Sequence, residues 1–260
     1  MELTCKSLVR IIPVVLVKDG NVVQSYSFQD HPIIGSPKAT LKRLLDFQAD
    51  EVILLDISEN KISYSMPITR QDVGRVGLNP VRLEDILDSC SDSILFPLAV
   101  GGGIRDLDYA KKLVALGADK IVFNRALIDD RGLVTDCAAS LGSQAVIAAV
   151  NVVETDIGFK VYDFRSKDAT LSENEFLPFI RGLEEIGCGE IFLNNVSRDG
   201  TRAGQNLALI SAVANEITIP LISCGGIGTR SDFADAIGSG ADAVAASNFF
   251  HSHELSYPLV

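Results

Sequence analysis

The chain contains one short pattern twice. Gly102-Gly103-Ile104 and Gly225-Gly226-Ile227 are each followed, at the same distance, by a Gly-Ala-Asp triplet, which begins at Gly117 and at Gly240. Both parts of the pattern are displaced by the same 123 residues. Each copy reads as an apolar strand, a glycine turn, an amphipathic helix and a second apolar strand, which together form a βαβ unit. Such a repeat predicts a chain built from two similar halves.

The number of apolar runs predicts how the two halves are joined. Eight short runs alternate with helical patterns, and continuous apolar runs are typical of strands covered on both faces of a parallel sheet. Eight strand–helix units within 260 residues favour a closed (β/α)8 TIM barrel over an open doubly wound sheet. We therefore predict an α/β fold, with one barrel over residues 1–260 and half-barrels of about 1–140 and 141–260. The runs are Val9–Val17, Glu51–Ile57, Leu95–Val100, Lys120–Phe123, Ala145–Val152, Glu190–Val196, Ile219–Ser223 and Ala243–Ala246.

Two segments depart from this alternation. Phe159–Arg165 and Lys167–Thr170 carry alternating and turn-forming residues, which predicts a small hairpin added to a loop and not a barrel strand. After Ser247 only about a dozen residues remain, and they include Pro258. The outer helix after the last strand is therefore expected to be short or missing.

Charge and hydropathy exclude several classes of partner. The formal net charge is −11 and no run of Lys or Arg is present, whereas nucleic acid and anionic membranes require a basic surface. Anionic small molecules remain acceptable, because backbone N–H groups can hold them locally. The chain lacks a signal-peptide pattern and any apolar run approaching the roughly 20 residues that cross a bilayer. These features predict a cytoplasmic protein.

Cysteine and histidine spacing predicts neither a metal nor a cofactor site. The five cysteines are odd in number and widely separated, which argues against a disulfide framework or a zinc site, so reduced thiols are expected. His31, His251 and His253 have no metal-ligand spacing to a Cys or Asp cluster. We therefore expect no metal and no cofactor.

The doubled glycine loops are candidates for phosphate binding. Active sites of such barrels form at the carboxyl ends of the strands, where Gly101-Gly102-Gly103 and Gly225-Gly226 lie. Glycine lets backbone N–H groups approach an anion, and the helix that follows adds a partial positive charge. Asn124 ends the fourth run and Ala246-Ser247 ends the eighth. The alternative is that the glycines only form tight turns, although the matched repeat favours a shared ligand type.

Two aspartates are placed to join the same mouth. Asp199-Gly200-Thr201 follows the sixth run and offers a carboxylate, a flexible turn and a hydroxyl. Asp56 ends the second run, where a buried carboxylate facing the mouth could bind substrate or act as an acid or base. The alternative for Asp56 is a residue that caps a helix or fixes a loop.

Seven motifs, spread from Arg10 to about Phe250, resemble those of one family. They are Arg10-Ile11-Ile12-Pro13, Val17-Lys18-Asp19-Gly20, Leu55-Asp56-Ile57, Val100-Gly101-Gly102-Gly103-Ile104, Gly142-Ser143-Gln144-Ala145-Val146, Ser197-Arg198-Asp199-Gly200-Thr201 and Ala245-Ala246-Ser247. The chain is thereby similar to the cyclase subunit of imidazole glycerol phosphate synthase. The resemblance implies a (β/α)8 barrel that binds a substrate with a phosphate at each end, as the doubled glycine loops suggest independently.

The resemblance implies which residues hold the two phosphates. One phosphate would contact Gly102, Gly103 and Asn124. The other would contact Asp199, Gly200, Gly225, Gly226, Ala246 and Ser247. Position 125 departs from the family, because Arg125 stands where the family has a small hydroxyl residue. This difference implies a reshaped or more cationic first site.

The resemblance also implies that the catalytic pair of the family is missing. The family closes a ring with ammonia, using two aspartates at the ends of strands one and five as general acid and base. Those positions hold Leu16 and Asn151, and neither an alkyl group nor a carboxamide can act as a proton-transfer group. The catalytic residue is therefore unknown, and the candidates are Asp56, Lys18 and Asn151.

Four charged residues match a further feature of the family. The family passes ammonia from a partner glutaminase through the barrel, past a ring of alternating charges at the amino-terminal ends of four strands. The resemblance assigns this ammonia gate to Arg10, Glu51, Lys120 and Glu190, and the glutaminase-facing surface to Asp119 and Gln144. Four charges crowded into a barrel floor are tolerated when they pair. The alternative is that they are separately solvated strand ends.

A chain with the gate but without the aspartate pair resembles one branch of this family, encoded with surface-polysaccharide genes. That branch has leucine at the first aspartate position and ends near Ser-Tyr-Pro, as Leu16 and Ser256-Tyr257-Pro258 do here. The resemblance implies a glutaminase partner and delivery of ammonia to a separate sugar amidotransferase. The leading hypothesis is a barrel subunit that channels ammonia for sugar amidation. The alternatives are a working cyclase (a lyase) of histidine biosynthesis and a non-catalytic barrel that binds a phosphorylated small molecule.

Overall fold

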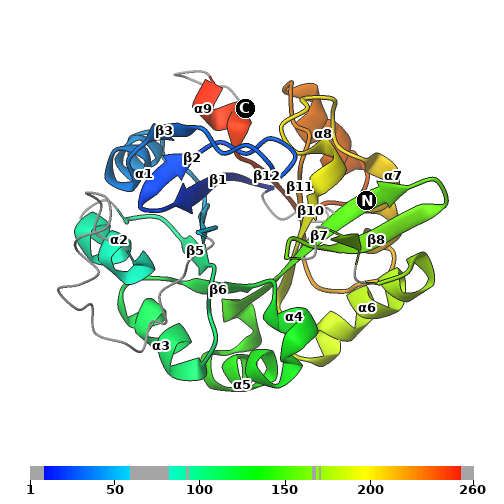
Figure 1. The fold of residues 1–260 in the computed structure, drawn as a ribbon, viewed down its shortest axis with the longest axis horizontal. Helices are drawn as coiled ribbons and strands as arrows, with labels where there is room; N and C mark the ends of the chain where they lie inside the picture. The colour runs from blue at the N-terminus through cyan, green and yellow to red at the C-terminus, as the bar shows by residue number, and fades with distance from the viewer. Residues whose placement is uncertain (1–8, 59–81, 92–93, 166–167, 170, 253–260) are drawn as a thin grey trace, which may run out of the picture.

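The computed structural model is a closed barrel of parallel strands (Figure 1). The structure describes residues 9–58, 82–91, 94–165, 168–169 and 171–252. Each barrel strand pairs in parallel with its two neighbours, and the ring closes where the last barrel strand pairs with the first. The predicted TIM barrel is thereby confirmed. In order around the ring, the strands are β1 (Arg10–Lys18), β4 (Val52–Asp56), β5 (Leu98–Gly101), β6 (Lys120–Phe123), β7 (Val146–Thr155), β10 (Glu190–Asn195), β11 (Leu221–Cys224) and β12 (Ala243–Ala246).

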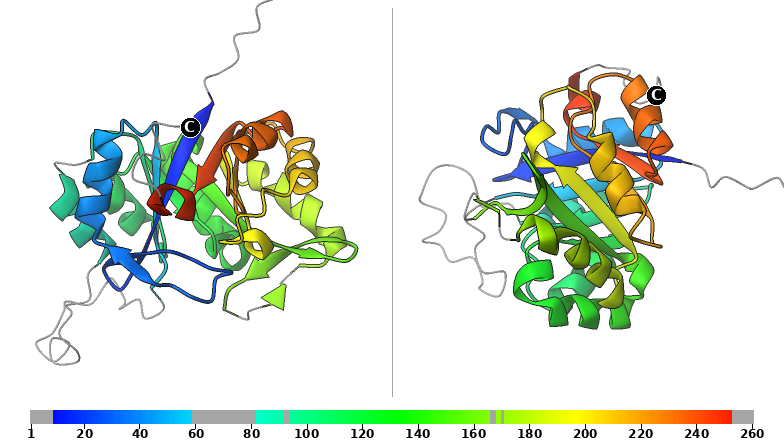
Figure 2. Two further views of the ribbon diagram at one scale, coloured as in Figure 1. Left: turned by 90° about the horizontal axis from the view of Figure 1, so that it is seen from above. Right: turned by 90° about the vertical axis from the view of Figure 1, so that its right-hand side faces the viewer.

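Helices surround the barrel on its outside (Figures 1 and 2). Several of them begin after a residue whose side chain accepts a hydrogen bond from a backbone N–H of the first turn, which fixes the helix start. These capping residues are Ser36, Asp106, Asp130 and Asn206. The helices are α1 (Pro37–Asp46), α2 (Leu83–Cys90), α3 (Leu107–Ala115), α4 (Ala126–Asp129), α5 (Arg131–Leu141), α6 (Glu173–Glu185), α7 (Leu207–Ala214), α8 (Ser231–Gly238) and α9 (Asn248–Ser252).

Alternation along the strands separates two apolar clusters. Outward side chains such as Val15 and Leu54 pack against the helices in the larger cluster. Inward side chains such as Ile12 and Ile53 form a second cluster within the ring of strands. This is the arrangement that the two-residue period of a strand requires. The interior of the barrel is therefore apolar between its floor and its mouth.

The sequence repeat has a structural counterpart where strands begin. Asp119 Oδ2 accepts a hydrogen bond from Leu98 N at 2.8 Å, and Asp242 Oδ2 accepts one from Leu221 N at 2.8 Å. The two pairs are separated by the same 123 residues as the glycine loops. Each aspartate ends a Gly-Ala-Asp triplet, so both triplets supply an acceptor for a backbone N–H at the start of the neighbouring strand.

Short strands extend the barrel at two places. β7 continues into an antiparallel pair with β8 (Gly158–Asp163), which pairs in turn with β9 (Asp168–Ala169); this confirms the predicted hairpin. β2 (Asn21–Val23) and β3 (Ile33–Gly35) add a second antiparallel extension, which the sequence did not reveal.

Short 3-10 helices, η3 (Ser143–Ala145) and η4 (Val196–Arg198), lie in loops. The last helix is short in the described part of the chain, where only α9 follows β12. Pro258 and the Ser-Tyr-Pro sequence lie outside the described residues.

Candidate functional site

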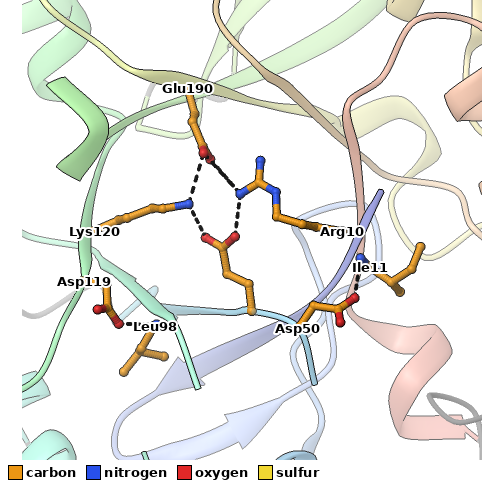
Figure 3. A network of polar contacts seen from close by, with 8 residues as sticks. Arg10, Ile11, Asp50, Leu98, Asp119, Lys120 and Glu190 are labelled. Atoms are coloured by element: carbon orange, nitrogen blue, oxygen red, sulfur yellow. Dashed lines mark hydrogen bonds and ion pairs between the residues drawn. The ribbon is translucent and has the colours of Figure 1, made fainter. Parts of the chain in front are cut away.

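Four charged side chains meet at the floor of the barrel, where the strands begin (Figure 3). Arg10 Nη1 lies 2.6 Å from Glu51 Oε2 and 3.1 Å from Glu190 Oε1. Lys120 Nζ lies 2.8 Å from Glu51 Oε1 and 3.0 Å from Glu190 Oε1. Each cation contacts both carboxylates, so the ring is closed and its formal charges cancel. The structure thus pairs these side chains, which are not separately solvated strand ends.

Burial makes this pairing necessary. The side chains of Glu51 and Glu190 are only 2% and 12% exposed, and a buried carboxylate is strongly destabilising unless cations and hydrogen bonds replace its water shell. Partial burial works to lower the pKa of the Arg10 guanidinium, but the charges of Glu190 and Glu51 and their hydrogen bonds raise that pKa above its ordinary value. Arg10 therefore stays charged within the ring.

Asp119 and Gln144 are exposed at the same end of the barrel as the charged ring. Asp119 directly precedes β6, with its carboxylate on Leu98 N (Figure 3). Gln144 lies in η3, just before β7, and its Nε2 is 3.5 Å from Leu141 O, a long contact that leaves the carboxamide accessible. Both side chains lie on the surface where the family resemblance places the partner.

Above the ring, the inward positions of β1 are apolar up to the mouth. Ile12 and Val14 belong to the interior cluster, and so does Leu16, which is 8% exposed. On the opposite wall, Asn151 Oδ1 of β7 lies 3.5 Å from Asn194 Nδ2 of β10. The first and fifth barrel strands thus present an alkyl group and a carboxamide at the mouth, and neither group can exchange a proton with a substrate.

The other two catalytic candidates lie differently. Ile53 and Leu55 belong to the interior cluster, so alternation places Asp56 on the outward side of β4. Asp56 Oδ1 accepts hydrogen bonds from Ser58 N at 3.0 Å and from Ser58 Oγ at 2.6 Å, the loop-fixing arrangement. Lys18 is the last residue of β1 and follows Leu16 in the inward alternation, so Lys18 is the candidate nearer to the mouth.

A pocket gathers all six residues of the second predicted phosphate site. They come from the end of β12 and the loops after β10, β11 and β12, which are neighbours in the barrel. The pocket is lined by Asp199, Gly200, Gly225, Gly226, Ala246 and Ser247, together with Arg202, Cys224, Ile227, Asn248 and Phe249. Two glycine loops and Arg202 therefore line one concave site, a setting in which backbone N–H groups and a cation can hold an anion.

Gly225 and Gly226 are required by the backbone of this pocket. Their φ angles are +100° and +98°, a region that side chains disfavour. A Cβ atom would lie 2.6 Å from Asn195 O at position 225 and 2.3 Å from Gly204 O at position 226. The second glycine loop therefore owes its shape to close backbone packing as well as to any ligand.

The loop after β2 holds Asp199 in place at the pocket. Ser25 Oγ donates to Asp199 Oδ2 at 2.6 Å, and Phe28 N donates to the same oxygen at 3.3 Å. Burial raises the pKa of Asp199 above its ordinary value, although these hydrogen bonds act in the opposite direction. Asn248 of α9 donates to Ser25 O at 2.7 Å. The loop therefore contacts two of the elements that line the pocket.

The first glycine loop lies beside β6. Gly102 and Gly103 follow β5 with φ angles of +105° and +73°. Asn124 follows β6, and its Nδ2 donates to Ala149 O at 2.6 Å, so its carboxamide is tied to β7. Arg125 Nε lies 3.1 Å from Asp129 Oδ2, which directs this guanidinium toward α4. The predicted first phosphate site thus rests on the N–H groups of the glycine loop.

Sequence reasoning missed four polar residues near these sites: Ser25, Arg202 and Asn248 at the pocket and Asn194 at the mouth. Asn194 had a signal, because it continues the inward alternation of Glu190 and Phe192 on β10. Asn248 and Ser25 had none, because they are 223 residues apart. Arg202 adjoins the Asp199-Gly200-Thr201 motif and could have been included with it.

The described cysteines are free thiols: Cys90, Cys137, Cys188 and Cys224. Among the described residues, no group of three or more His, Cys, Asp or Glu side chains is arranged to hold a metal ion. In the same part of the chain, no helix has both the length and the apolar character needed to cross a membrane.

Comparison with known proteins identifies the family. The sequence profile described as "Histidine biosynthesis protein" matches residues 10–256. The chain belongs to this family. Its HisF-like character follows from relatives named "Imidazole glycerol phosphate synthase subunit HisF". The relative from Alkaliphilus metalliredigens is 34% identical over 251 residues, which cover 96% of this chain and 92% of the relative.

Two further relatives carry the same name. The one from Hyphomonas neptunium is 35% identical over 248 residues, covering 95% of this chain and 91% of the relative. The one from Methanosphaerula palustris is 32% identical over 264 residues, covering 95% and 92%. This HisF-like chain is therefore similar to these subunits over nearly its whole length, from the charged ring to the pocket beyond β12.

Proposed function

We propose that this HisF-like chain is the barrel subunit of a glutamine-dependent amidation system. In this proposal it binds a HisH-like glutaminase at the floor of the barrel and passes ammonia through the interior. A separate amidotransferase then uses the ammonia to modify a sugar of a surface polysaccharide. The relatives named as synthase subunits support the coarser part of this proposal, namely a subunit that works within an ammonia-using assembly.

The observation that carries the proposal is the closed ring of Arg10, Glu51, Lys120 and Glu190. Two buried carboxylates at a barrel floor are costly, and an apolar layer would stabilise the floor equally well. The ring caps an apolar interior. A neutral molecule such as ammonia can cross such an interior, whereas an ammonium ion would lose its hydration.

The mouth supports delivery to another enzyme over ring closure within the barrel. In the family resemblance, two aspartates transfer protons at the positions of Leu16 and Asn151. An alkyl group and a carboxamide cannot perform that step, and Asp56 lies on the outward side of β4, bound to Ser58. Ammonia that reaches this mouth would therefore leave it unchanged.

Stimulation of the glutaminase tests the proposal. The purified chain, mixed with a HisH-like glutaminase from the same organism, should raise the rate of glutamine hydrolysis. Asp119→Lys should weaken both complex formation and stimulation, because the exposed carboxylate lies beside the charged ring (Figure 3). Asp136→Lys, an equal charge change at an exposed position of α5, is the matched control. If no complex forms and hydrolysis is not stimulated, the proposal is wrong.

A second candidate is a working cyclase of histidine biosynthesis. The pocket that gathers the six second-site phosphate residues favours it, as do the names of the relatives. Rescue of a histidine auxotroph that lacks the cyclase would establish this activity. We expect no rescue, and none from a Leu16→Asp, Asn151→Asp double variant, because Arg125 also differs.

A non-catalytic barrel that binds a phosphorylated small molecule is the third candidate, and the same pocket supports it. Titration with mono-phosphate and bis-phosphate sugars separates it from the leading proposal. Binding of these sugars by a chain that has no contact with any glutaminase would favour this candidate.

A further inference from the structure

Two carboxamides face each other inside the barrel, one on β7 and one on β10. Asn151 and Asn194 are register partners in these neighbouring parallel strands. Phe192 and Ala149, two residues earlier on each strand, belong to the interior cluster, so alternation turns both asparagines inward. Glu190 of the charged ring lies four residues before Asn194. The carboxamides therefore lie about 13 Å along the strand from Glu190, at the top of the apolar interior.

Their hydrogen bonds are incomplete. Asn194 Nδ2 lies 3.5 Å from Asn151 Oδ1, at the outer limit for a hydrogen bond. Asn194 Oδ1 is buried and has no hydrogen-bond partner among the described residues. A buried carbonyl oxygen without a donor costs about 1–3 kcal/mol. By contrast, Asn124, directly after β6, donates from Nδ2 to Ala149 O at 2.6 Å. The pair on β7 and β10 is thus open to a small hydrogen-bond donor.

The residues beside this pair on β11 and across the barrel on β1 are uncharged. Cys224 of β11 is the register partner of Asn194, and burial, then the nearby Asp199 charge, raises the pKa of its thiol, which stays protonated. Across the barrel, Leu16 of β1 offers only an alkyl group, and Lys18, the next residue in the inward alternation, lies nearer to the mouth. Asp199 lies beyond Cys224, and its carboxylate already accepts hydrogen bonds from the loop after β2. The charged groups below belong to the ring and neutralise one another.

We propose that Asn151 and Asn194 form a binding site for unprotonated ammonia at the exit of the barrel. Ammonia has three N–H donors and one lone pair. It would donate to Asn194 Oδ1 and Asn151 Oδ1, while a carboxamide N–H donates to its lone pair. This inference rests on the proposed ammonia-conducting function and adds to it a specific resting place.

A carboxamide at position 151 keeps this site neutral, as a carboxylate would not. A buried carboxylate favours an adjacent cation, so an aspartate at position 151 would hold ammonium as an ion pair. Ammonium is not a nucleophile, because its lone pair carries the proton. The uncharged carboxamides of Asn151 and Asn194 leave ammonia unprotonated. They bind it weakly, so that it can dissociate from the site. Asn151 then binds ammonia, and it is more than a position where the aspartate of the family is missing.

Titration of the isotope-labelled full chain with ammonium chloride tests the site without any glutaminase. The side-chain amide resonances of Asn151 and Asn194 should shift with added ammonium chloride, and those of Asn206, a helix cap on α7, should not. Because only the unprotonated form binds, the midpoint in total ammonium should fall about tenfold for each unit of rising pH below the ammonium pKa. Sodium chloride at equal concentration controls for ionic strength.

Two variants sharpen the result. Asn151→Asp preserves shape and adds a carboxylate, so the Asn194 resonance should respond to ammonium with a midpoint that no longer depends on pH. Asn215→Asp places the same change at the exposed end of α7 and should retain the tenfold dependence. No shift at Asn151 and Asn194 in the native chain, or a midpoint independent of pH, would overturn the site. Glutaminase stimulation is measured separately, so stimulation without these shifts rejects only this inference, and shifts without stimulation reject only the proposed partner.

Discussion

The charged ring makes a quantitative prediction about stability. Glu51 is 2% exposed and contacts both cations, so Glu51→Gln removes one carboxylate and leaves Arg10 and Lys120 sharing Glu190. Breaking a fully buried ion pair in this way costs about 3–5 kcal/mol. Because the two cations are 26% and 17% exposed, water recovers part of their solvation, and we expect a loss of about 2–3 kcal/mol. For a chain of this size that lowers Tm by about 5–10 °C.

A surface pair of similar geometry provides the control. Arg181 Nη1 lies 2.7 Å from Glu216 Oε2, with side chains 54% and 27% exposed. Glu216→Gln should therefore cost less than about 1 kcal/mol. Urea unfolding followed by circular dichroism measures both variants under the same conditions. If the two losses agree within about 0.5 kcal/mol, burial does not set the strength of the ring and the reasoning is refuted.

Three further predictions concern acid stability, the glycine loop and the pocket. Burial, and then the charge of Arg43, lowers the pKa of His251 from 6.5 to about 4, so the folded state takes up this proton less readily than the unfolded chain. Stability should fall by about 3 kcal/mol as pH drops from about 6.5 to about 4, and urea unfolding of His251→Gln should lack this loss. Gly226→Ala should destabilise the fold by more than about 1 kcal/mol in thermal unfolding. Gly238→Ala at the end of α8 is the control, because no atom lies within 4 Å of the new Cβ; it should stabilise the helix by up to about 1 kcal/mol. Burial raises the pKa of Asp199, so calorimetry should find sulfate binding tighter as pH falls and this carboxylate becomes neutral; an Asp199→Asn variant with the same pH dependence would contradict that assignment.

The barrel was predictable because its strands are buried on both faces. The fourth and eighth runs match β6 and β12 residue for residue. The second run, Glu51–Ile57, overran β4 by one residue at each end, although Ile57 N still donates to Val17 O of β1 at 2.8 Å. β3 was missed since all three of its residues are exposed, and an exposed short strand has no apolar period to detect.

Site residues could be predicted where they lie at the carboxyl ends of strands. They could not be predicted where they depend on contacts between loops that are distant in the sequence. The six pocket residues lie at or shortly after the carboxyl ends of β10, β11 and β12, so the parallel sheet brings them together. The hydrogen bonds among Ser25, Asp199 and Asn248 join two loops and α9, which are far apart in the chain, and no local pattern encodes them. Asp56 shows a different limit, because a strand-end carboxylate faces inward or outward according to a single residue of register.

The cyclic arrangement of the floor has a mechanical consequence. Each carboxylate of the ring has two cationic partners, so if Lys120 moves aside, Arg10 still contacts both Glu51 and Glu190, with one positive charge shared between two negative charges. The same holds with the two cations exchanged. A docking protein would need to displace only one cationic side chain. Each buried carboxylate would then keep one cationic contact. Either cation of the ring could therefore move while the other keeps its contacts with both carboxylates.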